Sequence, residues 1–274
     1  MVFRLPALFL TDVDGTLVTP KKLLTERAIQ AVQALRKKGI AFSFVSSRPP
    51  MGMKQIALSL DIQCPYAAFN GGAVILPDFK IWKTRPLSPD VVKKAVETIF
   101  QNGLDDTWIY TENNWYIHKP ELPRVQVEQS TVRFAPLAIE NHEAHFTNVL
   151  KIVGIGEDYK KVARCETELQ KSLSGLASAA RSQPYYVDVT NPQANKGTVL
   201  EDLCAYLKIS PSQAITIGDM PSDILMFKKG GFSIAMGNAS EEVKRSANIV
   251  TASNSEEGFA KAVEYVLSKI QSAA

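Results

Sequence analysis

The apolar residues near the N-terminus fall into short continuous runs, separated by a stretch with helical periodicity. Runs at residues 7–11, 40–45 and 66–69 have the length of strands that are buried on both faces. Between them, helices are predicted over 25–38 and near 51–60, the first with the apolar stripe Ala28, Ile29, Val32 and Leu35 and possible ends at Thr25 and Gly39. This alternation of strands and helices predicts a parallel sheet flanked by helices.

The middle of the chain has a different order of predicted helices and strands. A helix near its start carries the apolar stripe Val91, Val92, Ala95, Val96, Ile99 and Phe100. A hairpin is predicted over residues 107–119, with its turn at Asn113-Asn114. A strand at 149–154, a helix at 158–172 and two strands within 176–189 follow. We therefore expect a separate α+β module over residues 83–187, inserted into the first domain.

The last part of the chain returns to the α/β rhythm. A helix is predicted from Lys196, with Val199, Leu200, Leu203 and Leu207 on one face. The further predicted elements are a strand at 213–217, a helix at 221–228, strands at 231–236 and 248–250, and a helix at 255–270. The predicted fold class is α/β, with a Rossmann-like parallel-sheet core formed by residues 1–82 and 188–274.

Composition excludes several classes of protein. The chain has 274 residues, 45% of them hydrophobic, and a net charge of only +3 without a dense Lys/Arg block, so nucleic acid is not an expected partner. No signal peptide and no run of about 18 apolar residues is evident, so no membrane association is expected. Three widely spaced cysteines fit neither a disulfide framework nor a metal site, which indicates a reducing, cytoplasmic setting.

Two carboxylates follow the first predicted strand directly. Asp12 and Asp14 are two residues apart in extended chain, so their side chains point to the same side. They face the crevice beyond the carboxyl ends of the strands, where open α/β sheets bind ligands. Like charges this close repel each other unless a cation neutralises them, and hard carboxylate oxygens suit Mg²⁺.

Three more groups of polar residues lie just after predicted strands or at helix starts. They are Ser46 in VSSRP, Lys196 in ANKGT, and Asp219 with Asp223 in GDMPSD. These residue types suit phosphoryl transfer, which depends on positioning and charge neutralisation. A carboxylate can act as the nucleophile, a second carboxylate as the acid and base, and Lys and Ser can hold the phosphoryl oxygens.

Four motifs in this order resemble those of the haloacid dehalogenase superfamily of phosphohydrolases. DVDGT matches its first motif, Ser46 its second, Lys196 its third and GDMPSD its fourth. The NGG at residues 70–72, the MGNA at 236–239 and the long insertion, which is similar to a type II cap, resemble the Cof-type sugar-phosphatase branch. The resemblance covers nearly the whole chain and implies that the inserted module is a cap that selects the substrate.

The resemblance also implies roles for individual residues. Asp12 would be the nucleophile and Asp14 the general acid and base. Mg²⁺ would be held by the carboxylates of Asp12 and Asp219 and by the backbone carbonyl of Asp14. Asp223 would support the metal by holding these ligands or through a water molecule. Substrate and phosphate contacts are expected from Ser46, Ser47, Arg48, Asn70, Gly71 and Lys196.

Two positions depart from the pattern of that branch. Ser222 stands where Asn is usual and Ser47 where Gly is usual. A serine still donates a hydrogen bond, so we expect a changed rate and a changed loop shape rather than a loss of activity.

The predicted function is Mg²⁺-dependent hydrolysis of a small phosphorylated metabolite, with a sugar phosphate as the expected substrate class, by a monomer or homodimer. A phosphomutase or phosphotransferase with the same first step is an alternative, because only the acceptor differs. A non-catalytic sugar-phosphate-binding protein is a second alternative. Outside the motifs, His142 and His145 are interpreted as surface histidines, and His118, Tyr110, Trp115 and Tyr116 as cap packing.

Overall fold

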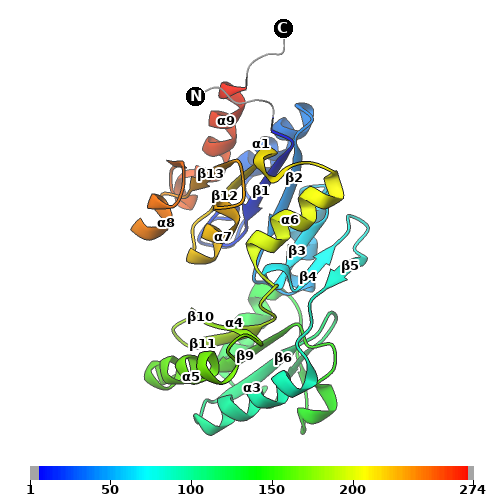
Figure 1. Cartoon of the computed structure of the whole chain (residues 1–274), viewed down its shortest axis with the longest axis vertical. Coiled ribbons are helices and arrows are strands. Elements are labelled where there is room, and N and C mark those ends of the chain that lie inside the picture. Colours follow the sequence, from blue (N-terminus) through cyan, green and yellow to red (C-terminus); the bar gives the residue numbers. More distant parts are fainter. Residues whose placement is uncertain (1–5, 271–274) are drawn as a thin grey trace. The chain divides into compact units, whose positions relative to one another are not determined.

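The computed structural model describes residues 6–270, and the chain folds into two compact units. The first comprises residues 1–47, 54–82 and 195–274, and the second comprises 48–53 and 83–194. Figure 1 labels most of their helices and strands. The predicted domain boundary at 187/188 lies inside strand β11 (Tyr186–Thr190), which pairs with strands of the second unit, and the two units divide after Ala194 instead.

An eight-stranded sheet in the order β14-β13-β12-β1-β2-β3-β4-β5 forms the centre of the first unit. Neighbouring strands from β14 to β3 are parallel, and β4 runs antiparallel to β3. The strands are β1 (Leu8–Asp12), β2 (Ala41–Val45), β3 (Tyr66–Ala68), β4 (Ala73–Ile75), β5 (Ile81–Thr84), β12 (Ala214–Gly218), β13 (Phe232–Ala235) and β14 (Ile249–Val250). This arrangement confirms the predicted α/β class.

Helices cover both faces of β1, which is why its side chains are apolar in both directions. On one face, Phe9 packs edge-on against Phe259 of α9 (Gly258–Lys269), which lies beside α1 (Glu26–Lys37). On the other face, Leu8 and Leu10 join a core with α6 (Lys196–Leu207), α7 (Ile224–Phe227) and α8 (Glu241–Arg245). Burial on both faces explains the apolar run of β1, and its one carboxylate, Asp12, is at the end of the strand.

The second unit is built on a six-stranded sheet in the order β10-β11-β9-β6-β7-β8. Its other strands are β6 (Asp106–Tyr110), β7 (Trp115–Ile117), β8 (Leu137–Ala138), β9 (Lys151–Ile155) and β10 (Ser178–Gln183). α3 (Pro89–Gln101) and α5 (Tyr159–Ser172) share one core with this sheet, and α4 (Pro123–Val132) follows β7 in the chain. α2 (Pro50–Ser59) contributes residues to both units.

Most predicted elements are confirmed within a few residues of their bounds. Thr25 caps α1 by accepting a hydrogen bond from the backbone N–H of Ala28, and the predicted hairpin is formed by β6 and β7 with Tyr110 opposite Trp115. Helices α4 and α8 and strands β4, β5 and β8 were not predicted, because they are short or weakly periodic.

The predictions for Phe100, His142 and His145 were wrong, and His145 is half-buried with its ring stacked on that of Tyr116. Phe100 was placed on the buried stripe of α3 but is 82% exposed, because its angular position lies beyond the face that meets the sheet. His142 is half-buried rather than on the surface: its Nε2 contacts the carbonyl oxygen of Thr107 at 2.9 Å, and its ring packs on that of His118. Tyr110 and Trp115 are buried in the packing of the second unit, as expected.

Candidate active site

Three neighbouring strands of the first unit end beside one another and each contributes a polar residue. Asp12 is the last residue of β1, Ser46 directly follows β2, and Asp219 directly follows β12. β1 pairs with both other strands, and the three are parallel, so their carboxyl ends meet at one edge of the sheet. This is the edge at which open α/β sheets bind ligands.

Lys196 connects two of the buried carboxylates. Its Nζ lies 2.6 Å from Oδ1 of Asp12 and 2.5 Å from Oδ1 of Asp223, and the Lys196 side chain is only 3% exposed. Lys196 is the first residue of α6, which begins after the N-cap Asn195. A cation at a helix N-terminus is electrostatically unfavourable, so the two carboxylates stabilise it in this position.

Asp223 braces the segment that follows β12. Its Oδ2 accepts hydrogen bonds from the backbone N–H groups of Asp219 (2.9 Å) and Met220 (2.8 Å), while its Oδ1 contacts Lys196. Asp223 is fully buried in the short helix η4 (Pro221–Asp223). Both of its oxygens are therefore used to orient Asp219 and Lys196, which is consistent with a supporting role behind a metal.

The carboxylate of Asp219 is oriented by residues to which the sequence analysis gave no role. Thr16 Oγ1 donates to its Oδ1 at 2.7 Å, and Asn238 Nδ2 lies 3.5 Å from its Oδ2 and donates to the carbonyl oxygen of Gly15 at 3.0 Å. A side chain at Gly15, where φ is +88°, would overlap with the Asp219 carboxylate. The DVDGT and MGNA motifs contain these residues, and that was the signal available in the sequence.

Burial and neighbouring charges both shift the pKa values of Asp12, Lys196 and Asp219. Burial raises the pKa of Asp12 well above its usual value, and Asp223 and Asp219 add to that shift, while Lys196 opposes it. Burial disfavours the charged form of Lys196, but Asp12 and Asp223 outweigh this and raise its pKa. Burial also raises the pKa of Asp219, although the hydrogen bond from Thr16 opposes the shift. The cluster therefore carries excess negative charge that a bound cation would stabilise.

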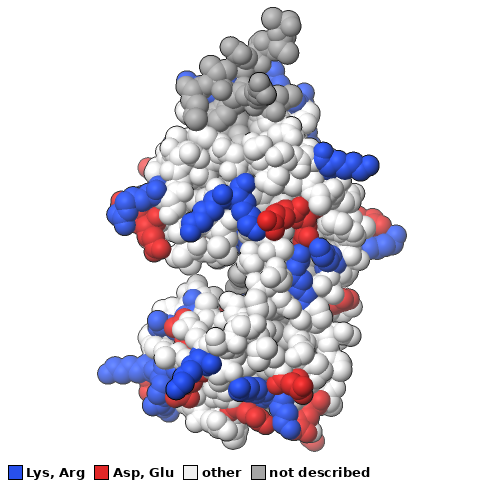
Figure 2. Space-filling view, in the orientation of Figure 1, with Lys and Arg blue, Asp and Glu red and all other residues white. Residues whose placement is uncertain are grey.

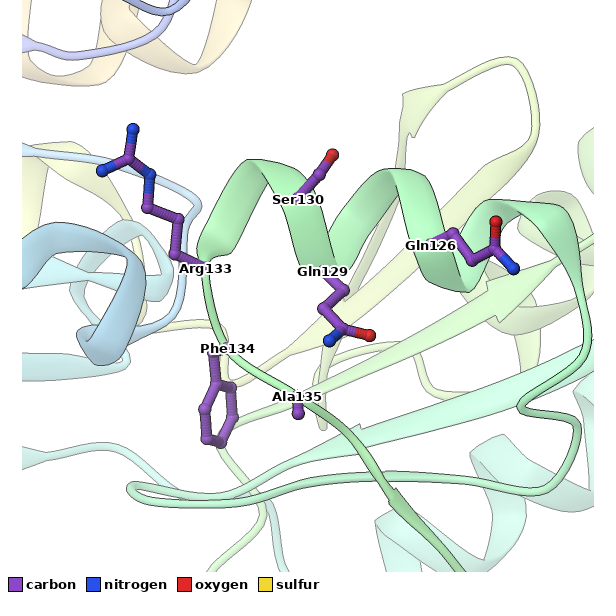
Figure 3. Close-up of a pocket in the computed structure, with 6 residues that line it drawn as sticks. All are labelled: Gln126, Gln129, Ser130, Arg133, Phe134 and Ala135. Carbon is purple, nitrogen blue, oxygen red and sulfur yellow. The ribbon is translucent and has the colours of Figure 1, made fainter.

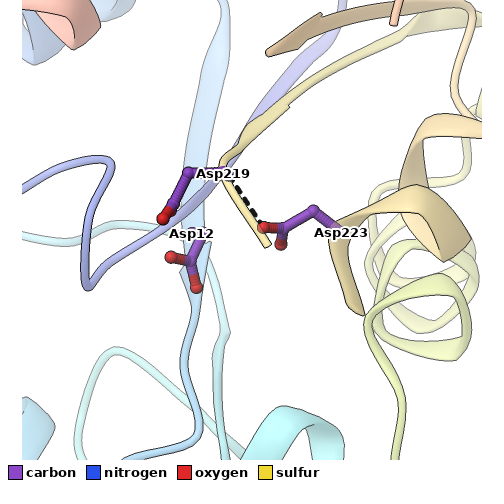
Figure 4. Close-up of side chains that lie close together, drawn as sticks. All are labelled: Asp12, Asp219 and Asp223. Carbon is purple, nitrogen blue, oxygen red and sulfur yellow. Dashed lines mark hydrogen bonds between the residues drawn. The ribbon is translucent and has the colours of Figure 1, made fainter. Parts of the chain in front are cut away.

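The donor set fits a divalent metal ion. Asp12, Asp219 and Asp223 each offer a carboxylate oxygen within 4.8 Å of the others, and all three residues are buried (Figure 4). Carboxylate oxygens are the ligands of hard cations such as Mg²⁺, Mn²⁺ and Ca²⁺. Asp223 already accepts two backbone N–H groups and the Lys196 ammonium, whereas Asp219 has one short contact, from Thr16, and Asp12 has one, from Lys196, so Asp12 and Asp219 are the better candidates for direct ligands.

Asp14 lies at the outer side of this cluster. Ser46 Oγ is 3.5 Å from its Oδ2, and the ammonium of Lys22 is 2.7 Å from its Oδ1. The Asp14 side chain is 27% exposed, whereas that of Asp12 is 6% exposed. A part-exposed carboxylate beside a buried one has the access to water that a proton-transfer role requires.

The other residues that were predicted to contact substrate or phosphate differ in their surroundings. Asn70 donates its backbone N–H to the carbonyl oxygen of Ser46 at 2.7 Å, and its buried Oδ1 has no hydrogen-bond partner. A Cβ on Gly71 would lie 2.6 Å from Val199 of α6, so glycine permits this close approach. Ser47 is half-buried at the end of a segment of the first unit, and Arg48 belongs to the second unit. Ser222 is exposed.

A hollow of about 590 Å³ lies in the second unit, along α4 and the segment after it (Figure 3). It is lined by Gln126, Gln129, Ser130, Arg133, Phe134 and Ala135. None of the residues predicted from the motifs lines it. Its amides, hydroxyl and guanidinium can hydrogen-bond to a polar ligand.

Two further features concern the charged side chains of the surface and the lengths of the helices. In the view of Figure 2, Lys and Arg side chains are interspersed with Asp and Glu, and the visible face of each unit carries no continuous basic stripe among the described residues. Within residues 6–270, every helix is too short or too polar to span a bilayer.

Known proteins are similar to this chain over nearly its whole length. Residues 9–263 match the family model of the haloacid dehalogenase-like hydrolases. A putative phosphatase of Haemophilus influenzae is 26% identical over 254 residues, covering 93% of this chain and 95% of that protein. The 5-amino-6-(5-phospho-D-ribitylamino)uracil phosphatase YitU of Bacillus subtilis is 25% identical and covers 93% of this chain and 96% of its own length.

Solved structures share the fold. A haloacid dehalogenase-like hydrolase from Bacteroides thetaiotaomicron has a TM-score of 0.87 at 28% identity, over 95% of this chain and 99% of that one. The subclass IIB sugar phosphatase BT4131 has a TM-score of 0.83 at 22% identity, over 96% of this chain and 99% of its own. The family and the fold predicted from the motifs are thereby confirmed.

Proposed function

Because the chain belongs to the haloacid dehalogenase-like hydrolase family, we propose that it is a Mg²⁺-dependent phosphatase that acts on a small phosphorylated metabolite. The observation that carries the proposal is the ion-paired cluster of Asp12, Lys196 and Asp223 beside Asp219. Relatives named phosphatases, which match over most of their length, support the same reaction class. We propose a sugar phosphate as the substrate class, in line with the sugar phosphatase that shares this fold.

In the proposed reaction, a carboxylate oxygen of Asp12 attacks phosphorus, and the bond from phosphorus to the leaving oxygen breaks. Asp14 donates a proton to that oxygen, which departs as an alcohol, and the phosphoryl group stays on Asp12 as an acyl phosphate. Asp14 then accepts a proton from water as the water attacks the phosphorus of this intermediate. Inorganic phosphate leaves and the carboxylate of Asp12 is regenerated.

Other residues position the reacting groups. Lys196 holds Asp12 in one orientation and offsets negative charge on the moving phosphoryl group. Ser46 and its neighbouring backbone would bind phosphoryl oxygens, and the closeness of Ser46 to Asp14 and Asn70 supports this role. Asp12 and Asp219, with the Asp14 carbonyl, would hold the metal, which supplies further charge neutralisation when bound. Asp223 keeps Asp219 and Lys196 in place.

The second unit is proposed to select the leaving group. Its hollow along α4 presents Gln126, Gln129, Ser130 and Arg133, side chains that hydrogen-bond to hydroxyl groups and anions. Replacing Arg133 by Ala should alter the ranking of substrates by kcat/KM while leaving the metal requirement unchanged. Lys160→Ala on α5 is the matched control, because Lys160 is also an exposed cation of the second unit.

The test of the phosphatase proposal is phosphate release from a panel of sugar phosphates and other phosphomonoesters. Wild-type protein with Mg²⁺ should release phosphate, and EDTA and Asp12→Asn should each abolish it. Trapping of ³²P on the wild-type protein but not on Asp12→Asn would identify the phosphorylated carboxylate. Phosphate release by Asp12→Asn at the wild-type rate would refute the assigned nucleophile, and transfer of the label to an added sugar would show a transferase.

A further inference from the structure

The chain places a second ammonium group at the candidate site, on a residue to which no motif draws attention. Lys22 Nζ lies 2.7 Å from Oδ1 of Asp14, and the two side chains are 48% and 27% exposed. Lys22 lies eight residues beyond Asp14, in the segment between β1 and α1. The contact is therefore made by a segment that turns back towards the end of β1.

Backbone hydrogen bonds hold that turn in shape. Lys22 N–H donates to the Thr19 carbonyl oxygen at 2.8 Å, and Thr19 N–H donates to the Leu23 carbonyl oxygen at 3.0 Å. Lys22 adopts φ +60°, a left-handed conformation that is uncommon for a residue with a long side chain. The turn fixes where the Lys22 side chain starts, and none of these bonds involves its ammonium, so the ammonium can be removed without removing the bonds of the turn.

The charge balance of the site shows what this ammonium changes. Asp12, Asp14, Asp219 and Asp223 together with Lys196 carry a formal charge of −3 when all are ionised. A bound divalent cation reduces this to −1, which still repels a phosphate monoester that is itself close to a dianion. Lys22 adds one positive charge beside Asp14, which reduces the repulsion between these carboxylates and the substrate.

The pair is too exposed for folding stability to be its main effect, since exposed ion pairs contribute about 0–1 kcal/mol. The ion pair instead fixes the position of Asp14, because Asp14 Oδ1 contacts Lys22 while its Oδ2 faces Ser46. We propose that Lys22 is a positioning residue that holds and neutralises Asp14, so that the phosphate dianion binds beside it. This inference rests on the proposed phosphatase function and concerns the affinity for the phosphoryl group.

The experiment compares Lys22→Met with Lys22→Arg and with Lys21→Met as the matched control. Lys21 is the adjacent exposed lysine, so its replacement changes the net charge equally. The probe is inorganic phosphate, measured both by calorimetric binding to the Mg²⁺-loaded protein and as a competitive inhibitor. One unit charge about 4 Å from an anion in a water-like environment changes its affinity by about fivefold.

We expect Lys22→Met to weaken phosphate binding and to raise KM by about fivefold at low ionic strength, with a smaller change in kcat. High salt should reduce the difference, because screening weakens exposed charges. Lys22→Arg and Lys21→Met should resemble the wild type. Unchanged phosphate affinity in Lys22→Met, or an equal loss in Lys21→Met, would overturn the inference.

The two proposals fail in different ways. If wild-type protein binds phosphate but hydrolyses no phosphomonoester, the proposed function fails, while the calorimetric comparison still tests Lys22. If wild-type protein hydrolyses substrate and Lys22→Met differs only in kcat, the function stands and the electrostatic role of Lys22 is wrong.

Discussion

The ammonium of Lys196 lies 2.6 Å from the carboxylate of Asp12, although 184 residues separate them in the chain. Both side chains are nearly inaccessible to water, and Asp223 contacts the same ammonium from a third part of the chain. This buried ammonium and its two carboxylates matter for stability as well as for the proposed reaction, because removing either charge leaves the other unpaired in a dry environment.

Replacement of Lys196 by Met should therefore affect both activity and stability. It leaves Asp12 and Asp223 facing each other without a cation, so we expect a loss of about 3–5 kcal/mol in the free energy of unfolding at neutral pH and loss of phosphate release. Urea unfolding and the phosphatase assay measure the two effects. Lys208→Met, at the exposed end of α6, is the control and should behave as wild type. Full stability of Lys196→Met would contradict the paired arrangement.

Gly15 and Gly39 provide a matched pair of glycine substitutions. Both have positive φ, +88° and +73°, so Ala strains the backbone at either position. At Gly39 the added Cβ meets nothing within 4 Å, whereas at Gly15 it overlaps with the Asp219 carboxylate. We expect Gly39→Ala to lose only about 1 kcal/mol and to remain active. Gly15→Ala should displace Asp219 and reduce metal affinity by tenfold or more, as measured by Mg²⁺ titration of activity. Equal metal affinity in both variants would be evidence against this role of Gly15.

Metal binding should stabilise the fold, since it neutralises buried carboxylates that burial otherwise disfavours in their charged form. Adding Mg²⁺ in 100-fold excess over its Kd should raise the free energy of unfolding by about 2.7 kcal/mol, and EDTA should reverse this. Thermal unfolding with and without Mg²⁺ measures it. Asp219→Asn should lose the Mg²⁺-dependent shift, whereas Asp61→Asn, at an exposed carboxylate, should retain it. A shift that persists in Asp219→Asn would place the metal elsewhere.

His142 should make the second unit sensitive to acid. Burial and the neighbouring His118 lower the pKa of His142 to about 4, from its ordinary value of 6.5. Because the unfolded chain takes up the proton first, this contribution to stability is complete above pH 6.5 and is lost as the pH falls towards 4.

The expected loss over that pH range is roughly 1–3 kcal/mol, and His142→Gln should lose less than wild type. Urea unfolding at pH 7.5 and pH 4.5 compares the two, with His145→Gln as a control on a neighbouring ring that stacks on Tyr116. Identical pH dependence of wild type and His142→Gln would show that this imidazole is not responsible.

Sequence patterns predicted those elements correctly whose structure depends on contacts between residues close together in the chain. The buried runs of β1 and β2, the N-cap of α1 and the hairpin of β6 and β7 depend on periodicity and on turn chemistry within a few residues. Phe100 shows where this fails, because the width of the buried face of α3 depends on how the helix rests on its sheet. The prediction for His142 fails for the same reason, since its partners are Thr107 in β6 and His118 just after β7, both distant from His142 in sequence.

The same distinction between local and distant contacts applies to the candidate site. The residue types and their order along the chain, from Asp12 to Asp223, determined the family and the reaction class, because phosphoryl transfer requires those groups at strand ends. Only the tertiary structure decided that Asp223 contacts the backbone of Asp219, that Thr16 and Asn238 orient the Asp219 carboxylate, and that Lys22 reaches Asp14. The contacts of Thr16 with Asp219 and of Asn238 with Gly15 join residues 203 and 223 positions apart, so they exist only once the parallel strands bring their ends together. The contacts of Asp223 with Asp219 and of Lys22 with Asp14 are closer in sequence, but they depend on the shape of the turns after the strands, which has no periodic signal.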